Sequence, residues 1–503
     1  MFRAIIIIML CTLLFEHCNS ASGGTPDAHK SPGSGGFDIR RIKHVIVIYQ
    51  ENWSFDGLYS QFPGADRTPF GTRIRQFDAN GAPIDSMNIP CDNEGRPFTG
   101  SPWKDKMPVI FYSLDSFNGG ENPYTNRSHT RDITHRFYHH PRQIDAGRND
   151  HFLYWSDSST AIPNGRENMN ALTFGGVDAS DLQVGRLAQN YTMCDRCFQS
   201  VYGGSFINHQ WLVSARMPLC PDTITNATKY ISDPASPLPG KWDNKLSATP
   251  AKDRPGYHYA INTVFPPFPP TDSNAKHGLM IPPLTDTTIG DRMSSAHVSW
   301  KWYAQGWNEA MKTPGAVDGA FQVHHQPFNY YQNFNPSTKE GAANRMKHLA
   351  DLDASFHSDL DHNTLPDVSF IKLTNLNDQH PDDADIRTGD SAVAALVREI
   401  QNHPAIWKDC AIIITFDEFG GRWDHVAPQP VDEYGPATRI PMIIISPFAK
   451  LGYVDTTHYE TVSILALIEK RWGLAPLTAR DRNAGNLLNA FTTSPAEERK
   501  RRK

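Results

Sequence analysis

Hydrophobic residues in this chain gather in short, nearly unbroken runs. Four runs are rich in β-branched residues: Ile42–Tyr49, Val368–Leu373, Ala411–Phe416 and Ile440–Ser446. A weaker run covers Val298–Tyr303. Runs of this length without polar alternation are typical of strands covered on both faces, as in a parallel sheet. We therefore predict five buried strands.

Helical periodicity separates these runs. Residues 390–402 and 460–472 place apolar side chains three and four positions apart, and Phe206–Ala215 is also typical of a helix. Alternating strands and helices predict an α/β fold with a doubly wound, mostly parallel sheet between helices. Residues 66–130 and 218–297 are rich in Pro, Gly, Asn and Asp with little periodicity, and we expect long loop insertions that form a cap.

The N-terminal residues 1–21 have the features of a secretory signal peptide. Arg3 precedes an apolar run, Ala4–Phe15, and small residues follow near Ala21. An uncleaved anchor is the alternative, but the run is shorter than the roughly 20 residues that span a membrane. A lipoprotein anchor at Cys18 fits poorly. We predict a secreted or periplasmic protein without a stable transmembrane anchor.

The remaining chain divides into three parts. Residues 22–37 are a Gly/Ser/Pro-rich flexible leader, 38–478 are one large domain, and 479–503 are a C-terminal tail that ends in a charged run.

Composition narrows the class of protein. The chain has 503 residues, with 48 Lys+Arg against 54 Asp+Glu and a formal net charge of −6. This near balance argues against a nucleic-acid partner. Five cysteines follow the signal, among them a Cys194-x-x-Cys197 pair. In an exported protein we expect a structural disulfide, for example one involving Cys91 or Cys220.

Polar residues stand where the predicted strands end. Glu51-Asn52 follows the first strand, Asp417-Glu418 follows the run at 411–416, and His380 follows the run at 368–373. Ser205 comes after Gly203-Gly204, just before a helical run. Because ligands in open α/β sheets bind beyond the carboxyl ends of strands, these residues are candidates for one site.

The residue types indicate a metal and a phosphate. Carboxylate and amide oxygens are ligands for hard cations. Ser205 stands where a helix N-terminus would offer N–H groups to a phosphate. A metal beside the hydroxyl would lower its pKa and make it a nucleophile. This combination predicts phosphoryl transfer through a covalent phospho-serine.

Each piece also has a purely structural interpretation. Glu51-Asn52 could cap the next helix, and Gly203-Gly204-Ser205 could be an ordinary turn. A purely structural role is harder to accept for Asp417-Glu418, because burying two adjacent carboxylates costs free energy unless their charge is compensated. Single histidines are more often structural, but several in one site could neutralise phosphate charge or protonate a leaving oxygen.

Six segments give the chain a recognisable likeness. They are IKHVIVIYQENWSFDGLYSQFPG, DITHRFYHHPRQIDAGRNDHF, SVYGGSFINHQ, DQHPDDADIRTGD, TFDEFGGRWDHVAP and RIPMIIISPFAKLGYVDTTHYETVSIL. In this order they resemble the phosphoesterase family of bacterial phospholipases C and acid phosphatase A, within the alkaline-phosphatase-like superfamily. The likeness covers about residues 40–478 and implies that this part is a phosphoesterase catalytic domain.

The resemblance implies roles for individual residues. Glu51, Asn52, Asp417 and Glu418 match metal ligands, and Ser205 matches the nucleophile, which also contacts the metal. One divalent ion is implied, with Mg, Ca, Mn and Zn all open. The remaining candidates are histidines of the phosphate pocket, His135, His324, His325 and His380, and substrate-binding residues, His209, Asp424 and His425.

One departure concerns substrate fit. The family's usual QENRSFD is QENWSFD here, so Trp53 replaces an arginine, which we expect to lie at the pocket rim. We predict an exported, metal-dependent, acid-phosphatase-like hydrolase of phosphate esters. Two alternatives stay open: a phospholipase C that holds choline in an aromatic cage built from Trp53, Tyr154, Trp155 and Trp307, and a non-catalytic surface protein that binds phosphate or glycans.

Overall fold

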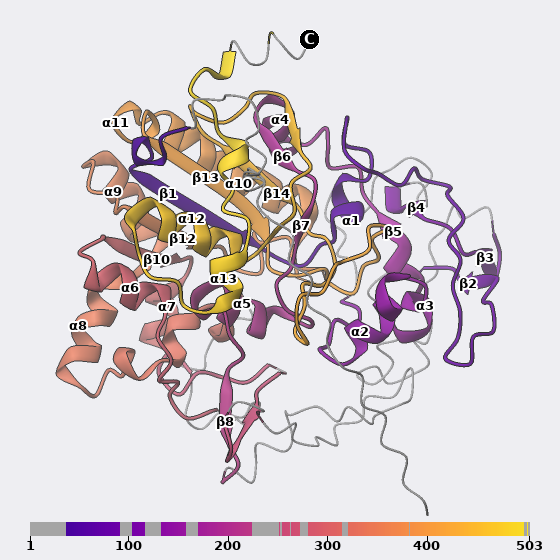
Figure 1. The fold of residues 1–503 in the computed structure, drawn as a ribbon, viewed down its shortest axis with the longest axis horizontal. Helices are drawn as coiled ribbons and strands as arrows, with labels where there is room; N and C mark the ends of the chain where they lie inside the picture. The colour runs from indigo at the N-terminus through magenta and orange to yellow at the C-terminus, as the bar shows by residue number, and fades with distance from the viewer. Residues whose placement is uncertain are drawn as a thin grey trace, which may run out of the picture. The chain divides into compact units, whose positions relative to one another are not determined.

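One eight-stranded sheet organises the chain (Figure 1). The computed structural model describes residues 37–90, 103–115, 132–156, 170–223, 251, 254–261, 263–271, 280–313, 320–381, 383–496 and 500. The strand order is β11-β10-β12-β1-β13-β14-β6-β15. All strands run parallel except β14, which is antiparallel to both of its neighbours. The predicted doubly wound, mostly parallel sheet is confirmed.

The five predicted strands are all present, with ends shifted by one or two residues. They are β1 (His44–Gln50), β10 (Trp300–Ala304), β12 (Val368–Lys372), β13 (Cys410–Phe416) and β14 (Met442–Ile445). In β12, β13 and β14 every residue is buried, so both faces of the central sheet are covered, as the apolar runs predicted.

Three strands of the eight-stranded sheet were not predicted. They are β6 (Thr192–Cys194), β11 (Leu349–Asp351) and β15 (Tyr453–Asp455), each of three residues. A run of three residues is too short to show a period in the sequence.

Helices lie against both faces of the sheet (Figure 1). Helix α5 (Ser205–Ser214) packs beside α12 (Ser463–Trp472), and α10 (Ile386–Gln401) packs beside α4 (Gln183–Asn190). The predicted helices at 206–215, 390–402 and 460–472 correspond to α5, α10 and α12. The other helices are α1 (Phe55–Tyr59), α2 (His139–Ile144), α3 (Phe152–Trp155), α6 (Ile289–Ser295), α7 (Trp307–Lys312), α8 (Lys339–His348), α9 (His357–Asp361), α11 (Pro404–Trp407) and α13 (Ala479–Asn483).

The two predicted insertions contain short regular elements in their described parts. The first holds β2 (Ser86–Asn88), β3 (Lys106–Pro108) and β4 (Tyr112–Ser113), and the second holds β8 (Leu219–Pro221) and β9 (Tyr257–Tyr259). The second also ends in α6, which packs against β10 and α5. The end of that segment therefore belongs to the main body, and the cap stays a prediction for the rest.

Residues near both ends of the described chain pack against the rest of the domain. The predicted signal and most of the leader lie outside the described residues, but Phe37 stacks on Phe491 with 5.4 Å between ring centroids. Arg480 is buried and pairs with Glu460 at 2.7 Å. Residues 479–491 therefore pack with the rest of the fold, and the predicted boundary at residue 478 stays a prediction. Among the described helices, none has the length and apolarity needed to cross a membrane.

The cysteines do not behave as expected. Cys194, Cys197, Cys220 and Cys410 are all buried free thiols. The disulfide prediction is thus wrong for these four, while Cys91 lies outside the described residues. Burial raises the pKa of the Cys194 and Cys197 thiols well above the usual value. Both therefore stay protonated, and a protonated thiol is a poor nucleophile.

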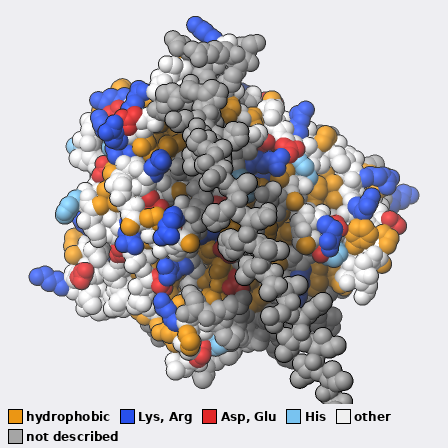
Figure 2. All heavy atoms as spheres, viewed as in Figure 1, with side chains coloured by type: hydrophobic (Ala, Val, Ile, Leu, Met, Phe, Trp, Pro, Cys, Tyr) orange, Lys and Arg blue, Asp and Glu red, His pale blue; other side chains and the backbone are white. Residues whose placement is uncertain are grey.

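The surface shows no concentration of one charge on the face seen in Figure 2. In the described part of that face, Lys and Arg side chains are scattered among acidic and apolar ones.

Candidate active site

The candidate residues meet because three neighbouring strands end at the same edge. In the sheet β12, β1 and β13 are adjacent and parallel, with Tyr49 opposite Lys372 and Gln50 opposite Phe416. Backbone bonds continue beyond the strands: Asp417 N–H donates to the Gln50 carbonyl at 3.0 Å, and Glu51 N–H donates to the Asp378 carbonyl at 2.9 Å. Glu51, Asp378 and Asp417 are thereby fixed side by side.

Ser205 is the first residue of α5 and faces these acids. Its Oγ donates to Glu51 Oε2 at 2.8 Å and lies 3.3 Å from Asn52 Oδ1. The residue before it, Gly204, leaves the helix without a side-chain cap. The first N–H groups of α5 thus keep their ability to bind an anion beside the hydroxyl.

Glycines allow these segments to approach closely. Gly420 has a φ of +60°, and a Cβ there would lie 2.3 Å from the Asn52 carbonyl oxygen. Gly203 has a φ of +97°, and a Cβ there would lie 2.9 Å from the Phe137 nitrogen. Both positions need a backbone that other residues rarely adopt.

The acid pair is completely buried. Asp417 Oδ1 accepts from the Glu418 N–H and Glu418 Oε2 accepts from the Gly420 N–H, both at 2.7 Å. The other oxygens, Asp417 Oδ2 and Glu418 Oε1, accept no hydrogen bond among the described residues. Burial, together with the charge of Glu51, raises the pKa of Asp417 well above its usual value and that of Glu418 to about 8.

A buried lysine, which the sequence analysis missed, balances part of this charge. Lys372 Nζ lies 2.5 Å from Glu51 Oε1 and 3.3 Å from Asp378 Oδ2, and all three side chains are 2% exposed or less. Burial is the largest influence and opposes ionisation of Glu51, but the Lys372 ammonium, His209 and His380 together lower the pKa of that carboxyl to about 2. A lysine at the end of an otherwise apolar run, VSFIKL, was the available signal.

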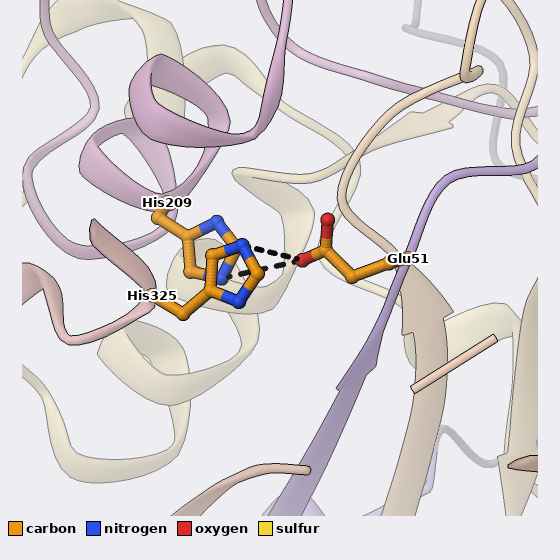
Figure 3. Close-up of side chains that lie close together, drawn as sticks. All are labelled: Glu51, His209 and His325. Carbon is orange, nitrogen blue, oxygen red and sulfur yellow. Dashed lines mark ion pairs between the residues drawn. The ribbon is translucent and has the colours of Figure 1, made fainter. Parts of the chain in front are cut away.

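Two parallel imidazoles face the same glutamate (Figure 3). His209 and His325 stack with centroids 4.8 Å apart, and their Nε2 atoms lie 3.8 and 3.5 Å from Glu51 Oε1. His209 Nδ1 is 2.8 Å from the Ser205 carbonyl, so the proton sits on Nδ1 and a lone pair on Nε2. Burial lowers the pKa of His209 to about 3, so the ring is neutral and its lone pair faces a carboxylate.

Three half-buried histidines stand at the edge of the site. His135 Nε2 lies 3.7 Å from Glu418 Oε1, and despite burial the charges of Asp132 and Glu418 raise its pKa to about 10. Burial likewise opposes protonation of His380, but nearby carboxylates raise its pKa. Burial lowers the pKa of His324 to about 4. The edge thus combines charged and neutral imidazoles.

These residues fit a divalent cation. Glu51, Asp417 and Glu418 are fully buried, two of their oxygens lack a partner among the described residues, and the raised pKa values of the acid pair show that negative charge is under-compensated. A metal would supply that compensation, and Asn52 Oδ1 and Ser205 Oγ are oxygen donors in contact.

Asp424 and His425 belong to a second buried network. Arg439 Nε lies 3.0 Å from Asp424 Oδ1, and its other nitrogens pair with Asp56 and Asp195. His425 Nδ1 lies 2.7 Å from Asp56 Oδ2. Their contacts in the described part of the chain join α1 to the loop after β13, and a role in substrate binding stays a prediction.

Trp53 does not lie at a pocket rim, contrary to our expectation. It is 1% exposed, and its Nε1–H donates to the Gln379 carbonyl at 3.0 Å. Each of the three tryptophans considered for the aromatic cage of the alternative function has a guanidinium over its ring: Arg422 over Trp53 at 3.9 Å, Arg142 over Trp155 at 4.9 Å, and Arg345 over Trp307 at 5.3 Å. Tyr154 packs edge-on against Trp155.

The sequence of this chain is similar to a known protein family and to individual proteins of known name. A family model described as the Phosphoesterase family matches residues 42–475. Phospholipase C A from Mycobacterium tuberculosis is 23% identical over 479 residues, which cover 90% of this chain and 77% of that protein. A non-hemolytic phospholipase C from Pseudomonas aeruginosa is 22% identical over 502 residues, covering 92% of this chain and 58% of that protein.

A solved structure is also similar. It is a protein in the alkaline phosphatase superfamily from Vibrio parahaemolyticus, 10% identical, with a TM-score of 0.31, covering 62% of this chain and 65% of that chain. The membership of a family rests on the sequence match over residues 42–475.

Proposed function

This chain belongs to the Phosphoesterase family and is a hydrolase of phosphoric esters, and we propose that it works through a covalent phosphate on Ser205. The observation that carries the proposal is the contact of Ser205 Oγ with Glu51 Oε2 at 2.8 Å, at the uncapped N-terminus of α5. A hydroxyl held there has carboxylates on one side and N–H groups on the other.

Five residues would hold one divalent metal: Glu51, Asn52, Ser205, Asp417 and Glu418. When bound, the metal supplies Lewis acidity at a phosphoryl oxygen and lowers the pKa of an adjacent hydroxyl. The Ser205 hydroxyl would lose its proton to solvent, and Oγ would form a bond to phosphorus while the bond from phosphorus to the leaving oxygen breaks. Water hydrolyses the serine ester in a second step and frees the hydroxyl.

The edge histidines and the helix terminus do the remaining work. The α5 N–H groups orient the phosphate, and His135, His324 and His380 surround its oxygens. Protonated imidazole can pass its proton to the leaving oxygen. His209 and His325 lie deeper, with their Nε2 atoms 3.8 and 3.5 Å from Glu51 Oε1, and Lys372 holds that carboxylate in place.

We propose a preference for phosphomonoesters, in an exported protein. The support is that the three tryptophans considered for a choline cage each stack with their own arginine. The second candidate is a phospholipase C, which the names of the two relatives above favour.

Hydrolysis of two chromogenic esters separates these functions. The mature protein is assayed with a phosphomonoester and with p-nitrophenylphosphorylcholine from acid to alkaline pH, beside the Ser205→Ala variant. We expect faster turnover of the monoester and loss of turnover in the variant. Preference for the choline ester would establish the second candidate. Activity on neither ester, with metal bound, would instead indicate a protein that binds phosphate or glycans.

A further inference from the structure

The turn that precedes Ser205 is held from two sides by buried side chains. The Gly203 N–H donates to His140 Nδ1 at 3.2 Å, and the Gly203 carbonyl accepts from Gln199 Nε2 at 3.1 Å. His140 comes from α2, and Gln199 follows β7 (Cys197–Phe198). Both side chains are completely buried, so neither contacts solvent or a bound substrate.

The same two side chains hold the residue after the acid pair. The Phe419 N–H donates to Gln199 Oε1 at 3.0 Å. The His140 ring stacks on the Phe419 ring, with centroids 3.6 Å apart and an interplanar angle of 12°. Phe419 directly follows Glu418, so the acid pair and the Ser205 turn are connected through both His140 and Gln199.

Each of the two side chains is held by more than one hydrogen bond. Because His140 Nδ1 accepts a hydrogen bond from the Gly203 N–H, its Nε2 carries the hydrogen and donates to Thr438 Oγ1 at 2.7 Å. Burial lowers the pKa of His140 well below its usual value, which keeps the ring neutral and Nδ1 able to accept. Gln199 Nε2 also donates to the Val201 carbonyl at 2.8 Å.

We propose that His140 and Gln199 are positioning residues that fix Ser205 relative to Asp417 and Glu418, acting through Gly203 and Phe419. The consequence for turnover rests on the function proposed above. Catalytic groups have to be held within roughly 0.5 Å of their working geometry. A misplacement of about 1 Å can cost roughly 100-fold in rate. Backbone held on both sides by buried side chains meets this requirement.

The test compares two variants with matched controls. Gln199→Leu and His140→Leu each remove one connection. Gln76→Leu is the control for the first, since Gln76 is a buried glutamine that donates from Nε2 to the Asn149 carbonyl at 3.0 Å and accepts the Leu153 N–H at 2.9 Å. His348→Leu is the control for the second, since His348 is buried and stacks on Trp300 at 4.1 Å. We measure kcat, KM and hydrogen exchange of the backbone at 199–205 and 417–421.

The two positioning variants are expected to lose roughly 10- to 100-fold in kcat with little change in KM. Hydrogen exchange of the backbone should rise at 199–205 and at 417–421, because His140 and Gln199 each contact both Gly203 and Phe419. The controls keep kcat and the exchange of these segments close to wild type, although they are also destabilised. If the positioning variants match their controls in exchange and in kcat, the inference is wrong.

Conservative variants serve if a leucine variant does not fold. His140→Asn keeps an acceptor for Gly203 but removes the ring from Phe419, so exchange should rise mainly at 417–421. Gln199→Glu keeps the acceptor for Phe419 but loses the donor to Gly203, so exchange should rise mainly at 199–205. Wild-type exchange in both variants would overturn the inference. Failure of the wild-type protein to hydrolyse any phosphate ester would instead contradict the proposed function and leave the exchange result as the test of positioning.

Discussion

Replacement of Lys372 by methionine tests whether the site depends on its buried counter-charge. Methionine has a similar length and leaves the cavity filled, so the main change is the loss of the ammonium from Glu51 Oε1, 2.5 Å away, and Asp378 Oδ2, 3.3 Å away. Removing one partner of a fully buried ion pair typically costs about 3–5 kcal/mol, because the other charge is left uncompensated. We expect a loss of that size in the free energy of unfolding.

Urea unfolding in the presence of a chelator measures this loss. Lys301→Met is the matched control, since Lys301 lies on the neighbouring strand β10 and pairs with Asp359 at 2.6 Å, but its side chain is 28% exposed. That control should lose no more than about 1 kcal/mol. Addition of a divalent cation should reduce the loss in the free energy of unfolding of the Lys372 variant, because the cation restores positive charge next to Glu51.

Equal destabilisation of the two variants would refute this reasoning. It would mean that Glu51 and Asp378 find other compensation when the ammonium is removed, and that Lys372 has no special role in keeping the metal-free site folded.

Three further predictions follow from the geometry. Gly420→Ala should abolish turnover and destabilise the protein by more than Gly473→Ala, because a Cβ at Gly420 would meet the Asn52 carbonyl at 2.3 Å, while one at Gly473, with a similar φ of +66°, meets nothing within 4 Å; equal unfolding midpoints would contradict this. His425 is partly desolvated, but its bond to Asp56 raises its pKa from 6.5 to about 9, so it contributes up to roughly 2–3 kcal/mol below pH 6.5 that is lost as pH rises through 9; unfolding of His425→Gln from pH 6 to 10 should lack this decline, and an unchanged pH profile would argue against it. Dialysis against a chelator should remove activity and lower the unfolding midpoint, and added divalent cations should restore both; full activity without metal would exclude the ligand set.

The central sheet could be predicted because burial on both faces makes a strand continuously apolar. β1, β12 and β13 were found in this way, and their shared edge placed Glu51 and Asp417 together. The direction of β14 could not be predicted, since an apolar run is the same whether its neighbours are parallel or antiparallel.

The site was harder to predict where a side chain's role depends on a distant partner. Trp53 is next to Asn52 in sequence, but Arg422 covers its ring and removes it from any rim. Lys372 is identified as a counter-charge only by its contact with Glu51, a residue 321 positions away. His140 stood beside His139 in the same motif, and only the contacts with Gly203 and Phe419 distinguish the two.

Capture of the phosphorylated enzyme tests the account most directly. Wild-type protein turning over a phosphomonoester is quenched in acid, digested and examined by mass spectrometry. The account predicts one phosphoryl group on the peptide that contains Ser205, absent from Ser205→Ala, which should also lose turnover. Undiminished turnover in Ser205→Ala, or a phosphoryl group on another residue, would contradict it.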